Sequence, residues 1–225
     1  MARVKEETKP IVLHDEQGNI TANYTAEMIE TIKNTVAKDA TDAELMMFLS
    51  VANKYGLDPF LKEVHFAKMG KGEDAQATIM TGRDGYAKIA KRHPDFLKCQ
   101  SMEVRENDEF HMDWDFGDLV GIKHTFGHMD RGKVVGAYAV LKTKSGDSLA
   151  TYVTREEYDT GKNAWGKYKS AMIKKVAENE VYKKFADING VDAIENMPSE
   201  FTEGVEKLET DSESVEFIDT NIKEE

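Results

Sequence analysis

The sequence predicts an α+β protein in which N-terminal helices, an antiparallel β-meander sheet and a long C-terminal helix precede an acidic flexible tail. Changes in periodicity support this prediction. Apolar residues recur at helical spacing in the segments before residue 57 and after Gly82, alternate with polar residues over 96–158, and return to helical spacing after residue 163. At 225 residues and 40% hydrophobic content, the chain can bury a core of its own. We expect a flexible N-terminus at 1–20, one folded domain at 21–197, and the tail at 198–225.

Two helices are expected before residue 57. An apolar stripe predicts the first over about 25–38. The second should begin at Thr41, because Glu44 follows three residues later and the pair has the signature of a capping box. Gly56 should end it. The predicted apolar face of this second helix comprises Leu45, Phe48, Leu49, Ala52 and Tyr55.

A strand pair and a third helix are expected next. Alternation of apolar and polar residues predicts a half-buried strand at 63–66, with Glu63 and His65 facing solvent. The polar run 70–74 predicts a hairpin turn into a second strand. The third helix should open at Gly82.

The second half of the chain should contain a sheet and one long helix. Period-two alternation over 96–158 predicts an antiparallel meander of about five strands with one face buried. The final helix is expected over 163–187. Its predicted apolar stripe comprises Met172, Ile173, Val176, Ala177, Val181 and Phe185.

The distribution of charge matters more than the net charge of −12. Residues 187–225 hold thirteen Asp/Glu and two Lys, so the acidity lies in the tail and residues 1–186 carry a net charge of only −1. Residues 161–185 hold seven Lys against two Glu. Because charges are screened beyond about 8–10 Å at physiological salt, this local excess governs contacts with phosphates.

The composition argues against a membrane protein, a secreted protein and a disulfide-bonded protein. No apolar run approaches the ~20 residues that a membrane span needs, and the N-terminus lacks the apolar core of a secretory signal. Cys99 is the only cysteine, so no intrachain disulfide is expected, and a lone cysteine on a strand is typical of a small core residue. We expect a cytoplasmic protein without a membrane partner.

Three ordered segments resemble the RecT/Bet family of phage single-strand annealing proteins. Residues 52–66 resemble the pattern AxxxGLDPFxxEI, and residues 82–90 resemble GxDGYxxIA. The segment from Trp165 to Phe185 resembles W…MxxKxAExxALRKAF, with a departure at ALR, where the chain has Val-Tyr-Lys. Lys183 keeps the charge there but lacks the bidentate fork of arginine.

The resemblance implies an ATP-independent recombination protein of a bacterial host cell's cytoplasm that coats single-stranded DNA and pairs it with a complementary strand. It also implies a homo-oligomer, either a ring or a helical filament, an annealed duplex intermediate, and a phage exonuclease and host single-strand-binding protein as partners. No enzymatic activity and no nucleotide cofactor are expected, and a divalent ion is kept open only as a modulator of DNA binding.

Single-strand binding requires cations for phosphates and flat side chains for bases. Two segments interleave such residues, one around the third helix and one at the start of the last helix. The candidate DNA-binding residues are Arg83, Lys88, Lys91, Arg92, Arg155, Lys162, Trp165, Lys167, Lys169, Lys174, Lys175 and Lys183. Tyr86 and Tyr168 accompany them. An alternative remains open for Trp165 and Tyr86, which could be core aromatics that position the lysines without touching bases.

Catalytic and metal sites find weaker support. The string from Gly82 to Lys88 has the wrong spacing for a phosphate-binding loop, which argues against ATP-driven strand exchange. A metal nuclease would draw on Glu109, Asp113, Asp115 and Asp118, although solvent-facing strand positions explain the same residues. His124 and His128 lie four apart on a strand, without the cysteines or HExxH motif typical of zinc.

The acidic tail has three interpretations: a competitor for the lysines, a docking segment for another protein, or a solubilising extension. The alternative function for the whole chain is a non-annealing single-strand-binding or accessory protein that recruits a nuclease through this tail.

Overall fold

The computed structural model describes residues 9–14, 20–69, 75–115, 118–126 and 130–194. In chain order the elements are β1 (Ile11–His14), β2 (Ile20–Tyr24), α1 (Ala26–Thr35), α2 (Asp42–Tyr55), β3 (His65–Met69), β4 (Gln76–Thr81), α3 (Arg83–Arg92), β5 (Phe96–Arg105), β6 (Glu109–Asp115), β7 (Asp118–Thr125), β8 (Val134–Thr143), β9 (Ser148–Thr154), α4 (Arg155–Tyr158), α5 (Asn163–Lys167), α6 (Lys169–Ala186) and β10 (Asp192–Ala193). Helices combined with mainly antiparallel sheets confirm the predicted α+β class.

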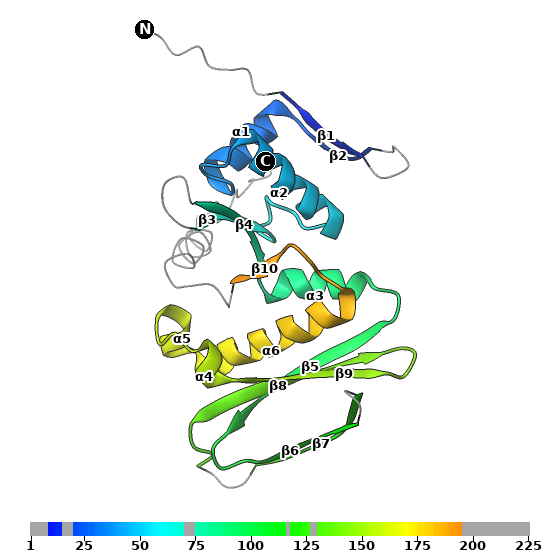
Figure 1. Ribbon diagram of the computed structural model, residues 1–225, viewed down its shortest axis with the longest axis vertical. Helices are drawn as coiled ribbons and strands as arrows, with labels where there is room; N and C mark the ends of the chain where they lie inside the picture. The colour runs from blue at the N-terminus through cyan, green and yellow to red at the C-terminus, as the bar shows by residue number, and fades with distance from the viewer. Residues whose placement is uncertain (1–8, 15–19, 70–74, 116–117, 127–129, 195–225) are drawn as a thin grey trace, which may run out of the picture.

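The elements are arranged in layers (Figure 1). The β1–β2 hairpin, α1, α2 and the β3–β4 pair lie at one end, and α3 and α6 cross the middle. The sheet of β5, β8 and β9 lies beneath these two helices, and the β6–β7 hairpin covers its far side. One apolar core runs through both ends of the molecule. No helix in the described ranges is both long enough and apolar enough to span a membrane.

The first strand of the fold lies within the segment 1–20 that was predicted to be flexible. Strand β1 pairs antiparallel with β2, with Leu13 opposite Ala22, and the Leu13 side chain is buried. Residues 11–14 therefore contribute to the fold, although they lie within the segment 1–20. Residues 1–8 and 15–19 lie outside the described residues.

Both N-terminal helices start where the sequence predicts, and each start is capped by a threonine. The hydroxyl of Thr25 accepts from the amide of Met28, and α1 follows over a shorter range than the predicted 25–38. The capping box of α2 is complete, because the Glu44 amide donates to the Thr41 hydroxyl and the Thr41 amide donates to the Glu44 carboxylate. Gly56 ends α2 in the left-handed conformation, with φ of 59°.

The strand pair β3–β4 is antiparallel as predicted, but the expected exposure of His65 is wrong. His65 is buried together with its neighbours Val64 and Phe66, and the ring of Phe66 packs edge-on against Phe48 of α2. Both faces of the chain are covered here, so the alternation of residue types does not report solvent exposure. The predicted turn at 70–74 lies outside the described residues.

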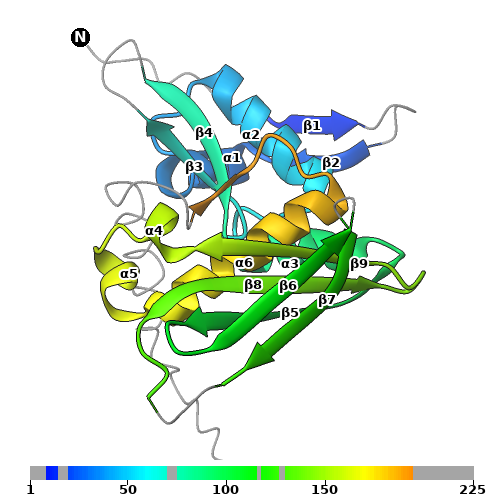
Figure 2. The same ribbon diagram turned by 60° about the horizontal axis from the view of Figure 1, so that its bottom comes forward.

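The five antiparallel strands predicted over 96–158 are present, but the prediction that they form one meander is wrong. Strand β8 lies between β5 and β9, and β6 and β7 pair only with each other among the described strands. The ring of Phe110 on β6 stacks on Tyr138 at 5.2 Å and on Tyr152 at 5.4 Å. Stacking these rings buries apolar surface, so the hairpin lies across the outer face of the sheet instead of extending it (Figure 2).

The long final helix is interrupted. Helix α5 ends at Lys167, and Tyr168 has φ of −121° and ψ of 45° before α6 begins. Gly166 disfavours helix here, and the neighbouring Trp165 is buried in the core. The predicted apolar stripe of α6 is confirmed, with Met172 and Phe185 only partly buried.

After α6 the chain returns to the core. Strand β10 pairs in parallel with β4, and Ile188, Val191 and Ala193 are buried. The hydroxyl of Tyr86 donates to the Val191 carbonyl oxygen at 2.8 Å. The start of the acidic region therefore belongs to the folded domain, whereas the tail predicted at 198–225 lies outside the described residues.

Candidate nucleic-acid interface

Two of the sequence motifs meet in space and form one joint between α2 and α3. The loop after α2 is closed by Glu63, whose carboxylate accepts from the Asp58 amide at 2.8 Å and also pairs with Lys88 of α3. The Glu63 carbonyl oxygen accepts from the Thr81 hydroxyl. A Cβ on Gly85 would lie 1.9 Å from that hydroxyl oxygen, so only glycine allows this approach.

Two of the four cations predicted around α3 serve this joint. Lys88 is paired with Glu63, and the guanidinium of Arg92 donates to the carbonyl oxygens of Tyr55 and Gly56. Arg83 pairs with Asp84 at 2.9 Å and with Glu178 of α6 at 3.4 Å. Lys91 is exposed. The α3 segment therefore offers phosphates fewer available cations than its sequence suggests.

Two of the three aromatics predicted beside the cations, Tyr86 and Trp165, are buried and cannot stack on a base. Tyr86 is fully buried under α6, and its ring lies 5.4 Å from the Lys183 ammonium. Trp165 is only 5% exposed. Both residues take the core role that the sequence left open for them. Their rings fix α3 and α5 against the rest of the fold.

Asp159 organises the segment that leads into α6. Its carboxylate accepts from the Gly161 amide at 2.8 Å and lies 3.1 Å from the Lys169 ammonium and 3.6 Å from Nε of Arg155. Burial alone would raise the pKa of Asp159, but the Gly161 amide and the two cations outweigh burial and lower it. Arg155 and Lys169 therefore share one carboxylate, which offsets one of their two positive charges.

Three other lysines of this region have no acidic partner among the described residues. Lys162 caps α5, Lys167 ends it, and Lys175 lies two turns into α6. All three are exposed, as is Tyr168 at the helix break. We call Lys162, Lys167 and Lys175 the α5–α6 lysine cluster. Such uncompensated ammonium groups attract phosphates without the cost of breaking an ion pair.

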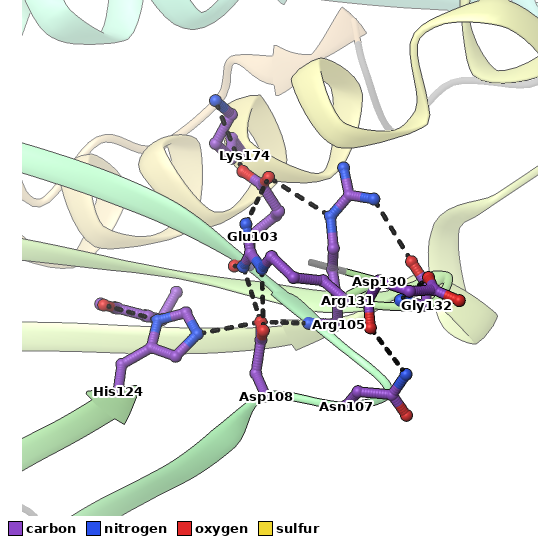
Figure 3. A network of polar contacts seen from close by, with 10 residues as sticks. Glu103, Arg105, Asn107, Asp108, His124, Asp130, Arg131, Gly132 and Lys174 are labelled. Atoms are coloured by element: carbon purple, nitrogen blue, oxygen red, sulfur yellow. Dashed lines mark hydrogen bonds and ion pairs between the residues drawn. The ribbon is translucent and has the colours of Figure 1, made fainter. Parts of the chain in front are cut away.

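Lys174 and Lys183 lie beside carboxylates. The Lys183 ammonium is 3.9 Å from Glu180, one turn earlier in α6. Lys174 is 3.8 Å from Glu103 of β5, which also lies 3.5 Å from Arg105 and from Arg131 (Figure 3). Glu103 thus links α6 to a buried polar network at the end of the sheet.

The centre of this network is Asp108, whose side chain has no solvent exposure. Its carboxylate accepts from Nε of Arg131 at 2.8 Å and Nη2 at 2.6 Å, and Nε2 of His124 lies 3.0 Å away. Nδ1 of His124 lies 3.2 Å from the Tyr138 hydroxyl. The Arg131 guanidinium holds the pKa of Asp108 well below its usual value. The network joins the β6–β7 hairpin to the sheet, and it was not predicted from the sequence.

The other polar candidates have local roles. Asp113 pairs with His111 and Glu109 with Lys123 on the exposed side of the β6–β7 hairpin, while His124 is engaged by Asp108. His128 lies outside the described residues. Burial raises the pKa of the Cys99 thiol to about 11, which keeps it protonated and unreactive at neutral pH.

Comparison with known proteins shows to which family the chain belongs. The RecT family model matches residues 22–210, a range that contains every element from α1 to β10. The chain belongs to the RecT family. This RecT family protein is also 34% identical over 86 residues to recombination protein Bet of Escherichia phage lambda. The alignment covers 37% of this chain and 30% of the phage protein, so the chain matches less than a third of that relative's length. The family resemblance inferred from the three sequence segments is confirmed.

Proposed function

We propose that this RecT family protein binds single-stranded DNA and anneals it to a complementary strand in phage-type recombination, without ATP. The observation that carries the proposal is the α5–α6 lysine cluster, which presents exposed and uncompensated cations in a chain whose net charge is negative. Family membership and the similarity to a phage recombination protein support the same reaction.

Binding energy can perform this work without catalysis. Each lysine contributes a weak, sequence-independent contact with the DNA backbone, and many such contacts add up along an oligomer of subunits. If the backbone is held by lysines, base edges stay open to a second strand. Strands that are not complementary then dissociate, whereas complementary bases stay paired, because only correct pairing yields a stable duplex. We therefore propose a non-enzymatic role with no nucleotide cofactor, acting as a homo-oligomer.

Mixing complementary oligonucleotides tests the proposal. The purified protein should accelerate annealing over the protein-free rate at low salt, and addition of ATP should not change that acceleration. The reaction is run with and without Mg²⁺, because a divalent ion can alter DNA binding. Binding of single strands without any acceleration would support the alternative, a non-annealing accessory protein. Absence of both binding and acceleration would reject the proposal.

The role of the tail is tested with a chain that ends at residue 197. We propose that the tail competes with DNA for the α5–α6 lysine cluster, since it is polyanionic. The truncated protein should then bind DNA more tightly and with a steeper dependence on salt. Unchanged binding together with loss of a protein partner, such as a phage exonuclease or a host single-strand-binding protein, would indicate docking instead.

A further inference from the structure

Tyr168 differs from the other aromatic residues of the last three helices. Tyr168 is 64% exposed, whereas Trp165 and Tyr182 are each 5% exposed and Tyr158 and Phe185 are partly buried. No hydrogen bond or ring contact of the Tyr168 side chain is found within the described part of the chain. The phenol ring therefore contributes little to the fold.

The backbone at Tyr168 is nonetheless fixed. Its amide donates to the Ala164 carbonyl oxygen at 2.7 Å, and its carbonyl oxygen accepts from the Met172 amide at 2.9 Å. These bonds tie the residue to both α5 and α6 at the point where the helix is interrupted. A tyrosine side chain has only two χ angles to order, so a ring on a fixed backbone loses little entropy when a flat ligand binds.

The surroundings of Tyr168 are cationic. Lys167 precedes it directly, Lys162 begins the same short helix, and Lys175 follows on the same exposed stripe of α6, with the small Ala171 between them. A phosphate held by these lysines would place its neighbouring bases within reach of the ring. A cation next to an exposed aromatic ring is the combination that single-strand binding requires.

The other exposed aromatic residues lie in different surroundings from Tyr168. Trp114 on β6 is exposed, but it lies between Asp113 and Asp115, which repel phosphates. The exposed ring of Phe126 is covered on one side by the Arg131 guanidinium at 3.9 Å. Trp114 thus differs from Tyr168 in its acidic neighbours, and Phe126 in its covered ring. The exposed ring of Tyr152 is stacked on Phe110, and Phe60 lies beside the carboxylate of Asp58, which accepts from its amide.

We propose that Tyr168 is a stacking platform for an unpaired nucleobase of single-stranded DNA, flanked by the α5–α6 lysine cluster that holds the backbone. The inference rests on the proposed function and adds a base-contacting residue to it. A stacked base must be unpaired, so Tyr168 favours single strands over duplex. The contact accepts any base, because every base has a π-face.

The test compares two DNA probes of equal length and phosphate count, oligothymidine and the same strand with abasic sites. Wild-type protein should bind oligothymidine roughly tenfold more tightly, the effect of one stacked base. Tyr168→Ala should remove this preference, while the dependence of affinity on salt stays unchanged because no phosphate contact is lost. Tyr168→Phe should keep the preference, since the ring remains. Trp114→Ala, which removes an exposed aromatic from the acidic hairpin, serves as the matched control and should behave as wild type.

Two results overturn the inference and are distinguishable. If wild-type protein binds both probes and Tyr168→Ala retains the preference, Tyr168 is not the platform, although the proposed function survives. If wild-type protein binds neither probe, the proposed function fails and the inference fails with it. Thermal unfolding by circular dichroism checks that each variant is folded before its affinity is compared.

Discussion

The guanidinium of Arg92 closes the end of α2 at Gly56, with Nη2 of Arg92 donating to the Gly56 carbonyl oxygen at 3.1 Å. Its Nη1 donates to the Tyr55 carbonyl oxygen at 2.8 Å. The last carbonyl groups of a helix lack partners within the helix, and a cation there also suits the helix dipole. Arg92, predicted as a DNA contact, therefore joins α3 to α2.

Replacement of Gly56 by alanine should destabilise the protein by about 2 kcal/mol. About half of this comes from placing an L-residue at φ of 59°, and the rest from lost hydrogen bonds, because the new Cβ would lie 1.7 Å from Nη1 of Arg92. Urea unfolding measures the change. In an Arg92→Ala background the same substitution should cost less, because its clash has been removed. Equal costs in both backgrounds would contradict this account.

Trp165 and Tyr168 lie three residues apart, but their replacement should change the stability of the protein by very different amounts, because only Trp165 is buried. Trp165→Ala should cost about 4 kcal/mol, because it leaves a large cavity in the core. Tyr168→Ala should change stability by less than about 0.5 kcal/mol, because its side chain is exposed. Both values come from urea unfolding. A Trp165→Ala variant with wild-type stability and lost DNA binding would assign Trp165 to the DNA after all.

The polar network makes stability depend on pH through Asp108. A carboxyl group whose pKa is lower in the folded than in the unfolded protein stabilises the fold above its unfolded pKa of about 3.9, and this contribution is lost as pH falls through the folded value. Stability should therefore decline progressively below about pH 5.

Asp108→Asn should cost about 3 kcal/mol at neutral pH, because it leaves the Arg131 guanidinium partly uncompensated. It should also flatten the acid decline, since the titrating group is gone. Urea midpoints from pH 7 down to pH 3 measure both effects. Asp113→Asn, an exposed carboxyl on the same hairpin, is the control and should leave the profile unchanged. A variant at Asp108 that keeps the full acid decline would show that other groups cause it.

Local signals made the helix starts predictable. Thr41 was identified as a helix start because a capping box involves residues within three positions of one another, and the helix starts near Thr25 and at Gly82 also followed from the local pattern of residues. The same holds for Gly56, which terminates α2 by its own backbone conformation. These features need no knowledge of how distant parts of the chain meet.

Contacts between distant residues could not be predicted in this way. Arg92 is 36 residues from Gly56, and Arg131 is 23 residues from Asp108, so neither partner follows from spacing. The pairing of β5 with β8 likewise skips a complete hairpin. The lysine-rich sequence is visible without the structure, but the carboxylates that pair with Lys88 and Lys169 become visible only in the fold.

The division of the lysines into paired and uncompensated groups predicts which of them set the salt dependence of DNA binding. Simultaneous replacement of Lys162, Lys167 and Lys175 by alanine should weaken single-strand binding for all sequences. The slope of log affinity against log salt should fall by about 2, because each phosphate contact contributes about 0.7 on single strands. Binding measured by fluorescence anisotropy between low and physiological salt gives the slope.

The control for this triple variant removes three other exposed lysines, so that the protein loses the same positive charge elsewhere. Lys123, Lys133 and Lys142 are exposed and lie on β7, before β8 and on β8, outside α5 and α6. Their combined replacement by alanine changes the net charge equally but should leave the slope nearly unchanged, since only lysines that touch phosphates release counterions. Equal slopes for the two triple variants would mean that DNA responds to overall charge, and the α5–α6 lysine cluster would then have no specific role.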